Sequence, residues 1–337
     1  MVTIRACVAT YLATIRDTGR GQEGGTGGRG RLDGMAAGPA GEFEAQRARL
    51  FGLAYRLLGS AADAEDVVQD TYLRWAGADQ ATVAAPPVWL AKVATNLCLN
   101  RLASAQARRE FYPGTWLPEP VLSSDGTLGP MDSTAQRDSV SLALLVLLER
   151  LTPAERAVFV LREAFGYGHR DIAAILEVSE ANCRQLHRRA RQRLPDGPSR
   201  FRPARGQWRD LADRFLAAAR DGDLPGLERL LAADVTAWAD GGGKVSVVWR
   251  PVLGRSRAAR YLAGITRFGA GVQIWLAEVN GAPAVICASA GTLVGVLVLE
   301  VSGDQITAVR GVVNPDKLGF ASGQVARLSH PQRLPGP

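Results

Sequence analysis

The sequence of 337 residues has few of the side chains that build metal sites and disulfide frameworks. It contains only three histidines, and its four cysteines, Cys7, Cys98, Cys183 and Cys287, lie far apart without any CxxC pair. This pattern argues against a zinc site and a disulfide-stabilised secreted fold, and it indicates the reducing cytoplasm. We therefore expect no cofactor.

Long apolar runs are also missing. No segment approaches eighteen uncharged apolar residues with helical character, so we expect no membrane span, and the N-terminal region lacks a hydrophobic stretch long enough for a secretory signal. Residues 1–41 include the glycine-rich run GRGQEGGTGGRGRLDG, which cannot bury enough surface to fold. We predict a disordered extension there.

Positive charge is in excess. The formal net charge of +7 favours a polyanionic partner, although charge alone predicts only nonspecific attraction. The hydrophobic fraction of 47% is sufficient to build cores, and the length predicts two or three domains.

The most informative stretch, residues 151–194, predicts three helices that end in a helix-turn-helix. Thr152 and Glu155 form a capping box at its start. A short helix over 170–177 and a tight turn follow, and Ser179 can cap the last helix. Residues at spacings of three and four predict the buried side of that last helix. They are Cys183, Leu186, Ala190 and Leu194.

The opposite side of this last helix is polar and cationic. Asparagine, glutamine and arginine match base edges in a major groove, and further arginines hold phosphates. The alternative is a solvated basic face on an ordinary bundle helix, but the order of short helix, tight turn and cationic helix favours DNA binding. The candidate DNA-contacting residues are Asn182, Arg184, Gln185, Arg188 and Arg189.

Amphipathic helices are also predicted nearer the N-terminus, over 43–58 and from Ser60 onward. In the second, acidic residues recur along one side. Acids near a helix start interact favourably with its dipole, but Asp70 lies too far along for that explanation. The acidic side is therefore either a solvated face or a partner-binding surface.

A third helix is predicted from about 87 to 102. Amides and cations outside it suit unstacked bases and single-stranded backbone, whereas Trp89 is more typical of a core residue. The residues expected to pack inward are Val88, Trp89, Val93, Leu97 and Leu102.

The segment SAADAEDVVQDTYLRW, followed by PPVWLAKVATNLCLNRL and then by the helix-turn-helix, resembles the extracytoplasmic-function (ECF) group of bacterial sigma factors over roughly residues 42–196. In that group the first domain binds core RNA polymerase and captures the melted −10 element, and the second reads the −35 element. The resemblance implies that residues 77–86 form the base-specificity loop and that the helix-turn-helix face contacts −35 DNA. It implies polymerase-facing residues Asp63, Asp66, Gln69 and Asp70, and −10 residues Asn96, Asn100 and Arg101.

Residues 111–138 are rich in proline, glycine and serine and include FYPGTWLPEP, whose three prolines restrain the backbone. WLPEP resembles a linker motif of sigma factors with an extra C-terminal domain, and DGGGK at 240–244 and NPDKL at 314–318 resemble two further motifs of that subgroup. We expect all three to form or adjoin one intramolecular contact surface. Its candidate residues are Trp116, Leu117, Pro118, Asp240, Lys244, Asn314, Pro315, Asp316 and Lys317.

Residues 208–322 predict an α+β module that resembles the cone-shaped SnoaL-like fold. A helix is predicted over 208–223 and a short helical segment over 227–231. Strands are predicted over 235–239, 245–250, 272–279, 284–290, 294–301 and 306–313. Related cones include cyclases and isomerases with a buried Asp or His as base. This domain has no histidine, which leaves Asp234, Asp240, Glu278 and Glu300 as possible bases.

The sequence therefore predicts a multidomain chain in which two all-α sigma-factor domains precede an α+β SnoaL-like domain. We expect a non-enzymatic, cytoplasmic alternative sigma factor that binds core RNA polymerase and promoter DNA, initiates transcription and is modulated by its C-terminal domain, with a small ligand possible there. A conventional helix-turn-helix regulator and a SnoaL-like cyclase or isomerase fused to a DNA-binding module remain alternatives. The expected boundaries are 42–110, 111–138 (linker), 139–196, 197–207 (linker), 208–322 and 323–337 (flexible tail).

Overall fold

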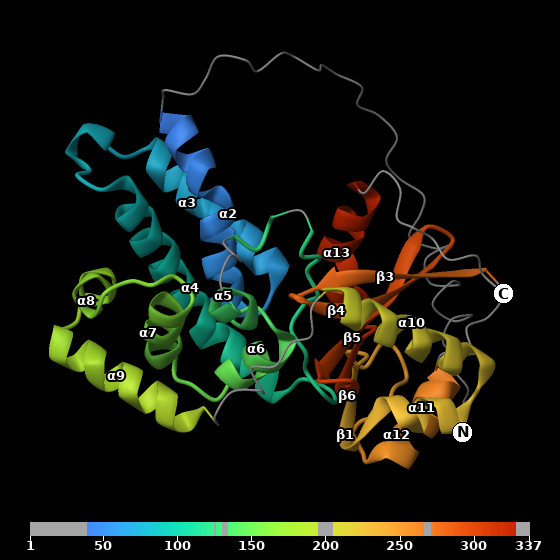
Figure 1. The fold of residues 1–337 in the computed structure, drawn as a ribbon. Coiled ribbons are helices and arrows are strands. Elements are labelled where there is room, and N and C mark those ends of the chain that lie inside the picture. The colour runs from blue at the N-terminus through green and yellow to red at the C-terminus, as the bar shows by residue number, and fades with distance from the viewer. Residues whose placement is uncertain (1–38, 125, 130–133, 195–204, 266–270, 328–337) are drawn as a thin grey trace, which may run out of the picture.

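The computed structural model describes residues 39–124, 126–129, 134–194, 205–265 and 271–327 (Figure 1). Within these ranges, none of the helices combines the length and the apolar character needed to cross a bilayer. Most of the predicted N-terminal extension lies outside the described residues. Its last three residues belong to the first helix.

The first helical domain consists of α2 (Pro39–Leu58), α3 (Ala61–Ala76), the short 3-10 helix η1 (Gln80–Thr82) and α4 (Pro86–Glu110). Ser60 caps α3 as predicted, because its side chain accepts a hydrogen bond from the Asp63 amide. The prediction that Val88 packs inward is wrong, since this side chain is 37% exposed. Val88 lies about 200° around the helix from Leu90, which begins the buried side. That side consists of Leu90, Ala91, Ala94, Leu97, Cys98 and Leu102.

The second helical domain contains α5 (Thr134–Asp138), α6 (Leu142–Leu148), α7 (Pro153–Glu163), α8 (His169–Leu176) and α9 (Glu180–Arg193). The capping box of Thr152 and Glu155 is present at the start of α7, and Ser179 caps α9. The predicted buried side of α9 is confirmed, because Cys183, Leu186, Ala190 and Leu194 are all buried.

The C-terminal domain begins with α10 (Arg205–Asp221) and α11 (Leu224–Leu230). Next come β1 (Leu231–Asp240), β2 (Val252–Leu253), α12 (Arg255–Ile265), β3 (Val272–Val279), β4 (Ala282–Ser289), β5 (Thr292–Ser302), β6 (Gln305–Val312) and α13 (Pro315–Arg327). The six strands form one sheet in the order β2-β1-β6-β5-β4-β3, in which β1 and β6 are parallel and the other pairs are antiparallel. The predicted sequence of two helical domains and one α+β domain is confirmed.

Two predictions for this domain are wrong. Residues 245–250 form a loop rather than a strand. Residues 245–247 line a cavity beside the sheet instead of pairing with a strand, and the pairing beside β1 comes later, at β2. Residues 323–327 belong to α13 rather than to a flexible tail. Gln324 anchors this end of the helix, since its side chain is buried and forms two hydrogen bonds with the Leu122 backbone.

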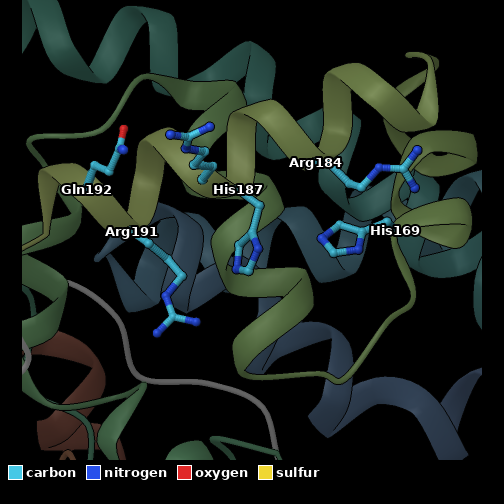
Figure 2. A pocket seen from close by; sticks show the side chains of 6 residues that line it. His169, Arg184, His187, Arg191 and Gln192 are labelled. Atoms are coloured by element: carbon cyan, nitrogen blue, oxygen red, sulfur yellow. The ribbon is translucent and has the colours of Figure 1, made fainter.

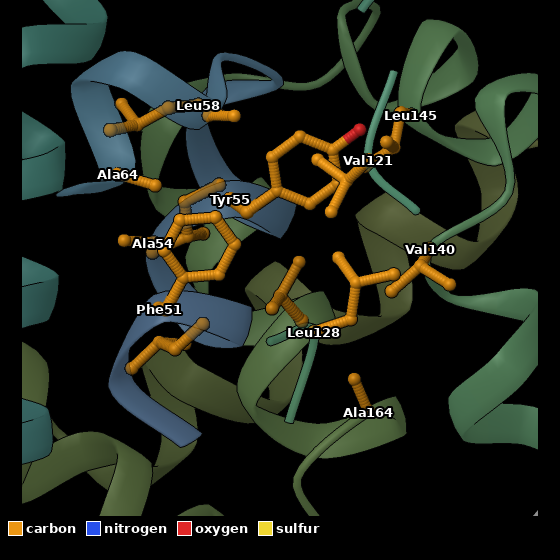
Figure 3. Packing of buried hydrophobic residues seen from close by; sticks show 14 of the residues in the cluster. Phe51, Ala54, Tyr55, Leu58, Ala64, Val121, Leu128, Val140, Leu145 and Ala164 are labelled. Carbon is orange, nitrogen blue, oxygen red and sulfur yellow. The ribbon is translucent and has the colours of Figure 1, made fainter. Parts of the chain in front are cut away.

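Both faces of the sheet are covered. On one face, α10, α11 and α12 enclose an apolar core. On the other, residues of β3, β4 and β5 join a core shared by both helical domains and by the linker (Figure 1). Figure 3 shows the part of this core in which linker residues pack with residues of the helical domains. The linker is therefore packed between domains rather than free. Its buried apolar residues are Leu117, Val121, Leu122 and Leu128.

Candidate promoter-binding and interdomain sites

The predicted DNA-binding face of α9 is exposed. Asn182, Arg184, Gln185, Arg188 and Arg189 all reach solvent. Arg184 pairs with Glu180 one turn earlier. Arg189 turns toward α7, where its Nε lies 3.5 Å from an oxygen of the buried Glu155 carboxylate. Arg189 therefore differs from the other four predicted DNA-contacting residues, because its charge stabilises the contact between α7 and α9.

An open groove lies where α8 begins beside α9 (Figure 2). His169 and His187 lie side by side in it, with ring centroids 5.4 Å apart, and His187 Nε2 lies 2.8 Å from Glu163 Oε1. Burial, reinforced by the positive charge of Arg162, lowers the pKa of His169. The remaining lining is cationic or polar and contains Arg184, Arg188, Arg191 and Gln192.

The sequence did not single out these two histidines. There, the small number of histidines only argued against a metal site. Among the residues that the structure describes, no group of three or more His, Cys, Asp or Glu side chains could hold a metal ion. The groove instead combines positive charge with hydrogen-bonding rings, which suits a phosphate group.

The predicted polymerase-facing acids and the predicted −10 residue Arg101 meet on one surface. Arg101 Nη2 lies 2.9 Å from Asp70 Oδ2, and Nη1 lies 3.3 Å from Asp66 Oδ2. The same Nη1 donates to the backbone oxygen of Asp63 at 3.2 Å. Arg101 thus ties α4 to the acidic side of α3. Of the other predicted −10 residues, Asn100 is exposed and Asn96 is half-buried.

One exposed side chain on α3 escaped the sequence analysis. Leu73 is 62% exposed and lies one helical turn beyond Gln69, which is also exposed. The sequence pattern of this amphipathic helix did not distinguish Leu73 from the buried apolar residues. A single exposed leucine is common on protein surfaces, but this one adjoins the predicted polymerase-facing side of α3.

The three sequence motifs meet at a buried polar cluster, here named the Asp240 cluster. The Asp240 carboxylate accepts hydrogen bonds from Tyr112 Oη at 2.5 Å, the Leu117 amide at 2.8 Å and Lys317 Nζ at 2.7 Å. The Asn314 side chain donates to Tyr112 Oη at 2.8 Å. The cluster consists of Tyr112, Leu117, Asp240, Asn314 and Lys317.

Lys317 is the cation at the centre of this cluster. It is buried, donates to the Leu117 carbonyl at 2.6 Å, and lies 4.5 Å from the ring centroids of Tyr112 and Trp116. The hydrogen bond with Asp240 and burial together raise the pKa of the Tyr112 hydroxyl, with burial the larger cause. The ring of Trp116 also lies against Gly59, where a Cβ atom would approach it to 2.9 Å.

The remaining residues of this predicted surface lie around the cluster. Pro118 is buried in the linker, and Pro315 begins α13. Lys244 Nζ lies 2.6 Å from Asp316 Oδ1, but both side chains are more than half exposed. Because solvent screens this outer pair, we expect its two charges to be coupled less strongly than those of the buried Lys317 and Asp240.

Two further linker contacts were missed by the sequence analysis because their partners are distant in the chain. Glu119 accepts hydrogen bonds from the Ala61 and Ala62 amides, at 2.9 and 3.1 Å, and so caps α3 from the linker. Asn280, buried at the turn between β3 and β4, donates to Tyr55 Oη at 2.7 Å and accepts from the Val121 amide at 3.0 Å.

The two helical domains are joined by buried arginines. Arg156 of α7 donates to the Leu57 carbonyl of α2 at 2.7 Å, and burial lowers its pKa to about 9. Arg56 of α2 donates to Ser139 Oγ at 2.7 Å and to the Leu128 carbonyl at 2.9 Å. These contacts hold both helical domains against each other and against the linker.

The residues considered as catalytic bases lie apart from one another. Asp234 is exposed, Asp240 belongs to its buried cluster, and Glu300 pairs with Arg310 at 2.5 Å. The backbone oxygen of Glu278 accepts a hydrogen bond from the Ser123 amide of the linker. None of the four lines the described cavity of this domain.

Comparison with known proteins agrees with this arrangement. The Sigma-70 region 2 family matches residues 43–108, and the Sigma-70 region 4 family matches residues 141–194. The chain is 37% identical over 290 residues to the ECF RNA polymerase sigma factor SigJ of Mycobacterium tuberculosis H37Rv, covering 82% of this chain and 92% of SigJ. The crystal structure of M. tuberculosis SigJ superposes with a TM-score of 0.67 and 34% identity, covering 83% of this chain and 98% of that one.

A second relative covers the chain to the same extent. The M. tuberculosis protein named "Probable ECF RNA polymerase sigma factor SigI" is 33% identical over 277 residues, which span 82% of this chain and 93% of SigI. Both relatives extend over the helical domains and most of the α+β domain, so the likeness is not confined to the DNA-binding module. This chain belongs to the family of ECF RNA polymerase sigma factors.

Proposed function

We propose that this sigma factor binds core RNA polymerase through α3, contacts the −10 element through α4 and reads the −35 element through α9. The observation that carries the proposal is the exposed cationic face of α9, placed beside a groove of matching charge in a chain of this family. Such a factor acts where core polymerase and promoter DNA are present, which is the cytoplasm.

For the −35 contact we assign base reading to the exposed N-terminal part of α9, with Asn182, Arg184 and Gln185, and assign Arg188 to a base or the backbone. His169 and His187 are assigned to a DNA phosphate, since they lie in the cationic groove beside that face. Arg189 is assigned a supporting role because it contacts Glu155.

The test is DNA binding by Arg188→Ala over a series of salt concentrations. If Arg188 reads a base, one position in the site loses about 1 to 3 kcal/mol of discrimination; if it holds a phosphate, binding to all sequences weakens and the salt slope falls by about one unit. Arg214→Ala is the matched control, because Arg214 is an exposed arginine on α10 with an acidic neighbour one turn away. Equal behaviour of the two variants would contradict the assignment.

For the polymerase contact we assign the acidic side of α3, with Asp63, Asp66, Gln69 and Asp70, and add Leu73 as its apolar anchor. Arg101 is assigned to positioning, since it holds this acidic side against α4. Asn96 and Asn100 remain the proposed −10 contacts, together with the loop over residues 77–86.

We further propose that the packed arrangement is a closed form that must open on the promoter. The −35 and −10 elements lie about 25 base pairs apart, which corresponds to about 85 Å of DNA at about 3.4 Å per base pair. In the structure the two helical domains are in direct contact, and Lys92 of α4 pairs with Glu177, which follows α8, at 2.9 Å. The Asp240 cluster holds the linker to the C-terminal domain and so favours this form.

Promoter-dependent transcription by purified core polymerase tests this regulation. Lys317→Met in the full chain weakens the Asp240 cluster without deleting a domain, and it should change the amount of transcript at limiting factor concentration. Lys244→Met, which removes the exposed charge pair with Asp316, is the matched control. Equal transcription by wild type and Lys317→Met would contradict the regulatory role and leave the sigma function itself intact.

We infer that the C-terminal domain is not catalytic. The described residues that line its cavity include no carboxylate and no histidine, which are the groups expected of a general base. Asp240 is the buried carboxylate of the domain, and it accepts hydrogen bonds from the linker instead. Turnover of a polyketide-like substrate by the full chain would overturn this inference.

A further inference from the structure

The C-terminal domain contains an apolar cavity of about 110 Å³. Its floor is the inner face of the sheet, with Val272, Leu297 and Val309, and one side is α12, with Leu262 and Ile265. The remaining wall is the loop over residues 245–247, which follows the DGGGK turn.

The lining residues that the structure describes offer no charge to a ligand. The titratable groups among them are Tyr261 and Cys287, and burial raises the pKa of each to about 12, so both are neutral at physiological pH. An ionised ligand would lose its hydration without gaining a counter-charge from these lining residues. An engineered apolar cavity of about 150 Å³ binds benzene, so the free space here accepts an apolar ligand of about that size or slightly smaller.

The loop that closes the cavity also contacts the Asp240 cluster. The amides of Lys244 and Val245 both donate to the Gly241 carbonyl at 3.0 Å, and the Gly242 amide donates to Asp240 Oδ1 at 3.1 Å. Gly242 lies so close to Asn314 that a Cβ atom would approach its side chain to 2.2 Å. The cavity wall and the cluster are therefore two ends of one tightly folded segment.

We propose that this cavity is a regulatory site for an uncharged apolar small molecule and that its occupancy is coupled to the Asp240 cluster through residues 241–247. Ligand binding requires only the cavity, whereas the coupling between ligand binding and the Asp240 cluster rests on the closed form proposed above. A ligand that fits the free volume leaves the loop in place. A larger ligand displaces residues 245–247, strains the contacts of Asp240 and Asn314, and favours the open form.

Binding is tested by calorimetry on the full chain with 1-octanol and octanoate, which match in chain length and differ in charge. We expect octanol to bind and octanoate to bind at least tenfold more weakly. Val294→Phe, which fills the cavity, should weaken octanol binding at least tenfold. Val301→Phe places the same side chain on the same strand outside the cavity lining, so it is the matched control.

Val247→Phe fills the cavity from the loop and replaces Val294→Phe if that variant fails to fold. Octanol binding that survives both filling substitutions, or the absence of both benzene and octanol binding at their solubility limits, overturns the site. Octanoate binding as tight as octanol overturns the uncharged ligand. The octanoate carboxylate would then be paired with Arg220. The buried Nε and Nη2 of Arg220 have no hydrogen-bond partner among the described residues, and its charge lowers the pKa of the Cys287 thiol.

Coupling is tested by comparing two ligand sizes in Lys317→Met. Because a weakened cluster makes the open form more populated, octanol should bind about threefold or more tightly to this variant, while benzene, which fits the closed cavity, should bind both proteins equally. Equal octanol affinity refutes the coupling. Small-angle scattering of unliganded wild type and Lys317→Met distinguishes the two proposals. If Lys317→Met is more expanded than wild type but its octanol affinity is unchanged, the coupling alone is refuted. If the two proteins have the same radius of gyration, the closed-form proposal is refuted.

Discussion

The contact between Lys317 and Asp240 gives a quantitative test of how firmly the C-terminal domain holds the linker. The Lys317 ammonium is buried, 2.7 Å from the carboxylate and 2.6 Å from the Leu117 carbonyl. Asp240→Ala leaves that ammonium without a counter-charge, which costs about 3 to 5 kcal/mol. Lys317→Met keeps the apolar length and leaves the carboxylate with its other donors, so the expected cost is about 1.5 to 3 kcal/mol.

The double variant removes both charges at once. Its cost should therefore be smaller than the sum of the two single costs, by at least about 2 kcal/mol. Urea unfolding of the full chain, followed by tryptophan fluorescence and circular dichroism, measures the free energy of unfolding of all four proteins. Single costs that add to within about 0.5 kcal/mol would refute the reasoning.

The matched control is the same cycle on Lys244→Met and Asp316→Ala. That pair is equally short, at 2.6 Å, but its side chains are 56% and 62% exposed. Because solvent screens an exposed pair, its coupling should not exceed about 1 kcal/mol. A coupling as large as that of the buried pair would show that burial is not the source of the difference.

Three further predictions concern single side chains. Glu119→Ala should lower the free energy of unfolding by about 1 to 2 kcal/mol, since α3 loses its cap. Because burial raises the pKa of Glu119 above 4.5, the free energy of unfolding should fall as pH rises from 4.5 through the raised pKa. Glu119→Gln should reduce this pH dependence, measured by urea unfolding at a series of pH values. His169 has a pKa lowered below 6.5, so stability should fall as pH drops below that value, and His169→Gln should remove this dependence. Leu73→Ala should leave the melting temperature unchanged and weaken binding to core polymerase by about 1 kcal/mol or more in an anisotropy titration; Leu224→Ala, on α11, is the control, and equal effects of the two would contradict an anchor at Leu73.

The parts of the fold that were predicted well depend on short-range patterns. The buried side of α9 follows from residues spaced three and four apart, and the strand over 272–279 coincides with β3 because β-prone residues are bounded by turns. The helix over 255–265 was missed. Its sequence, RSRAARYLAGI, carries alanines where a stronger apolar pattern would have marked a buried side.

The contacts between domains could not be predicted in detail because no local pattern encodes them. The side chain of Asn280 reaches Tyr55, which is 225 residues away in the sequence, and Glu119 caps a helix that begins 58 residues earlier. The WLPEP, DGGGK and NPDKL motifs suggested which segments approach one another. They did not indicate that Tyr112 and Gln324 take part, since neither belongs to a motif.

The buried linker has a consequence for how this protein tolerates change. A connecting segment usually accepts substitutions and insertions, because little depends on its exact course. Here Leu117, Glu119, Val121 and Leu122 each contact a different neighbour across a domain boundary. One residue inserted within this segment would force the contacts on one side of the insertion out of register with their partners. In a library of random variants, the most sensitive positions should therefore include the segment between the domains as well as the interior of each domain.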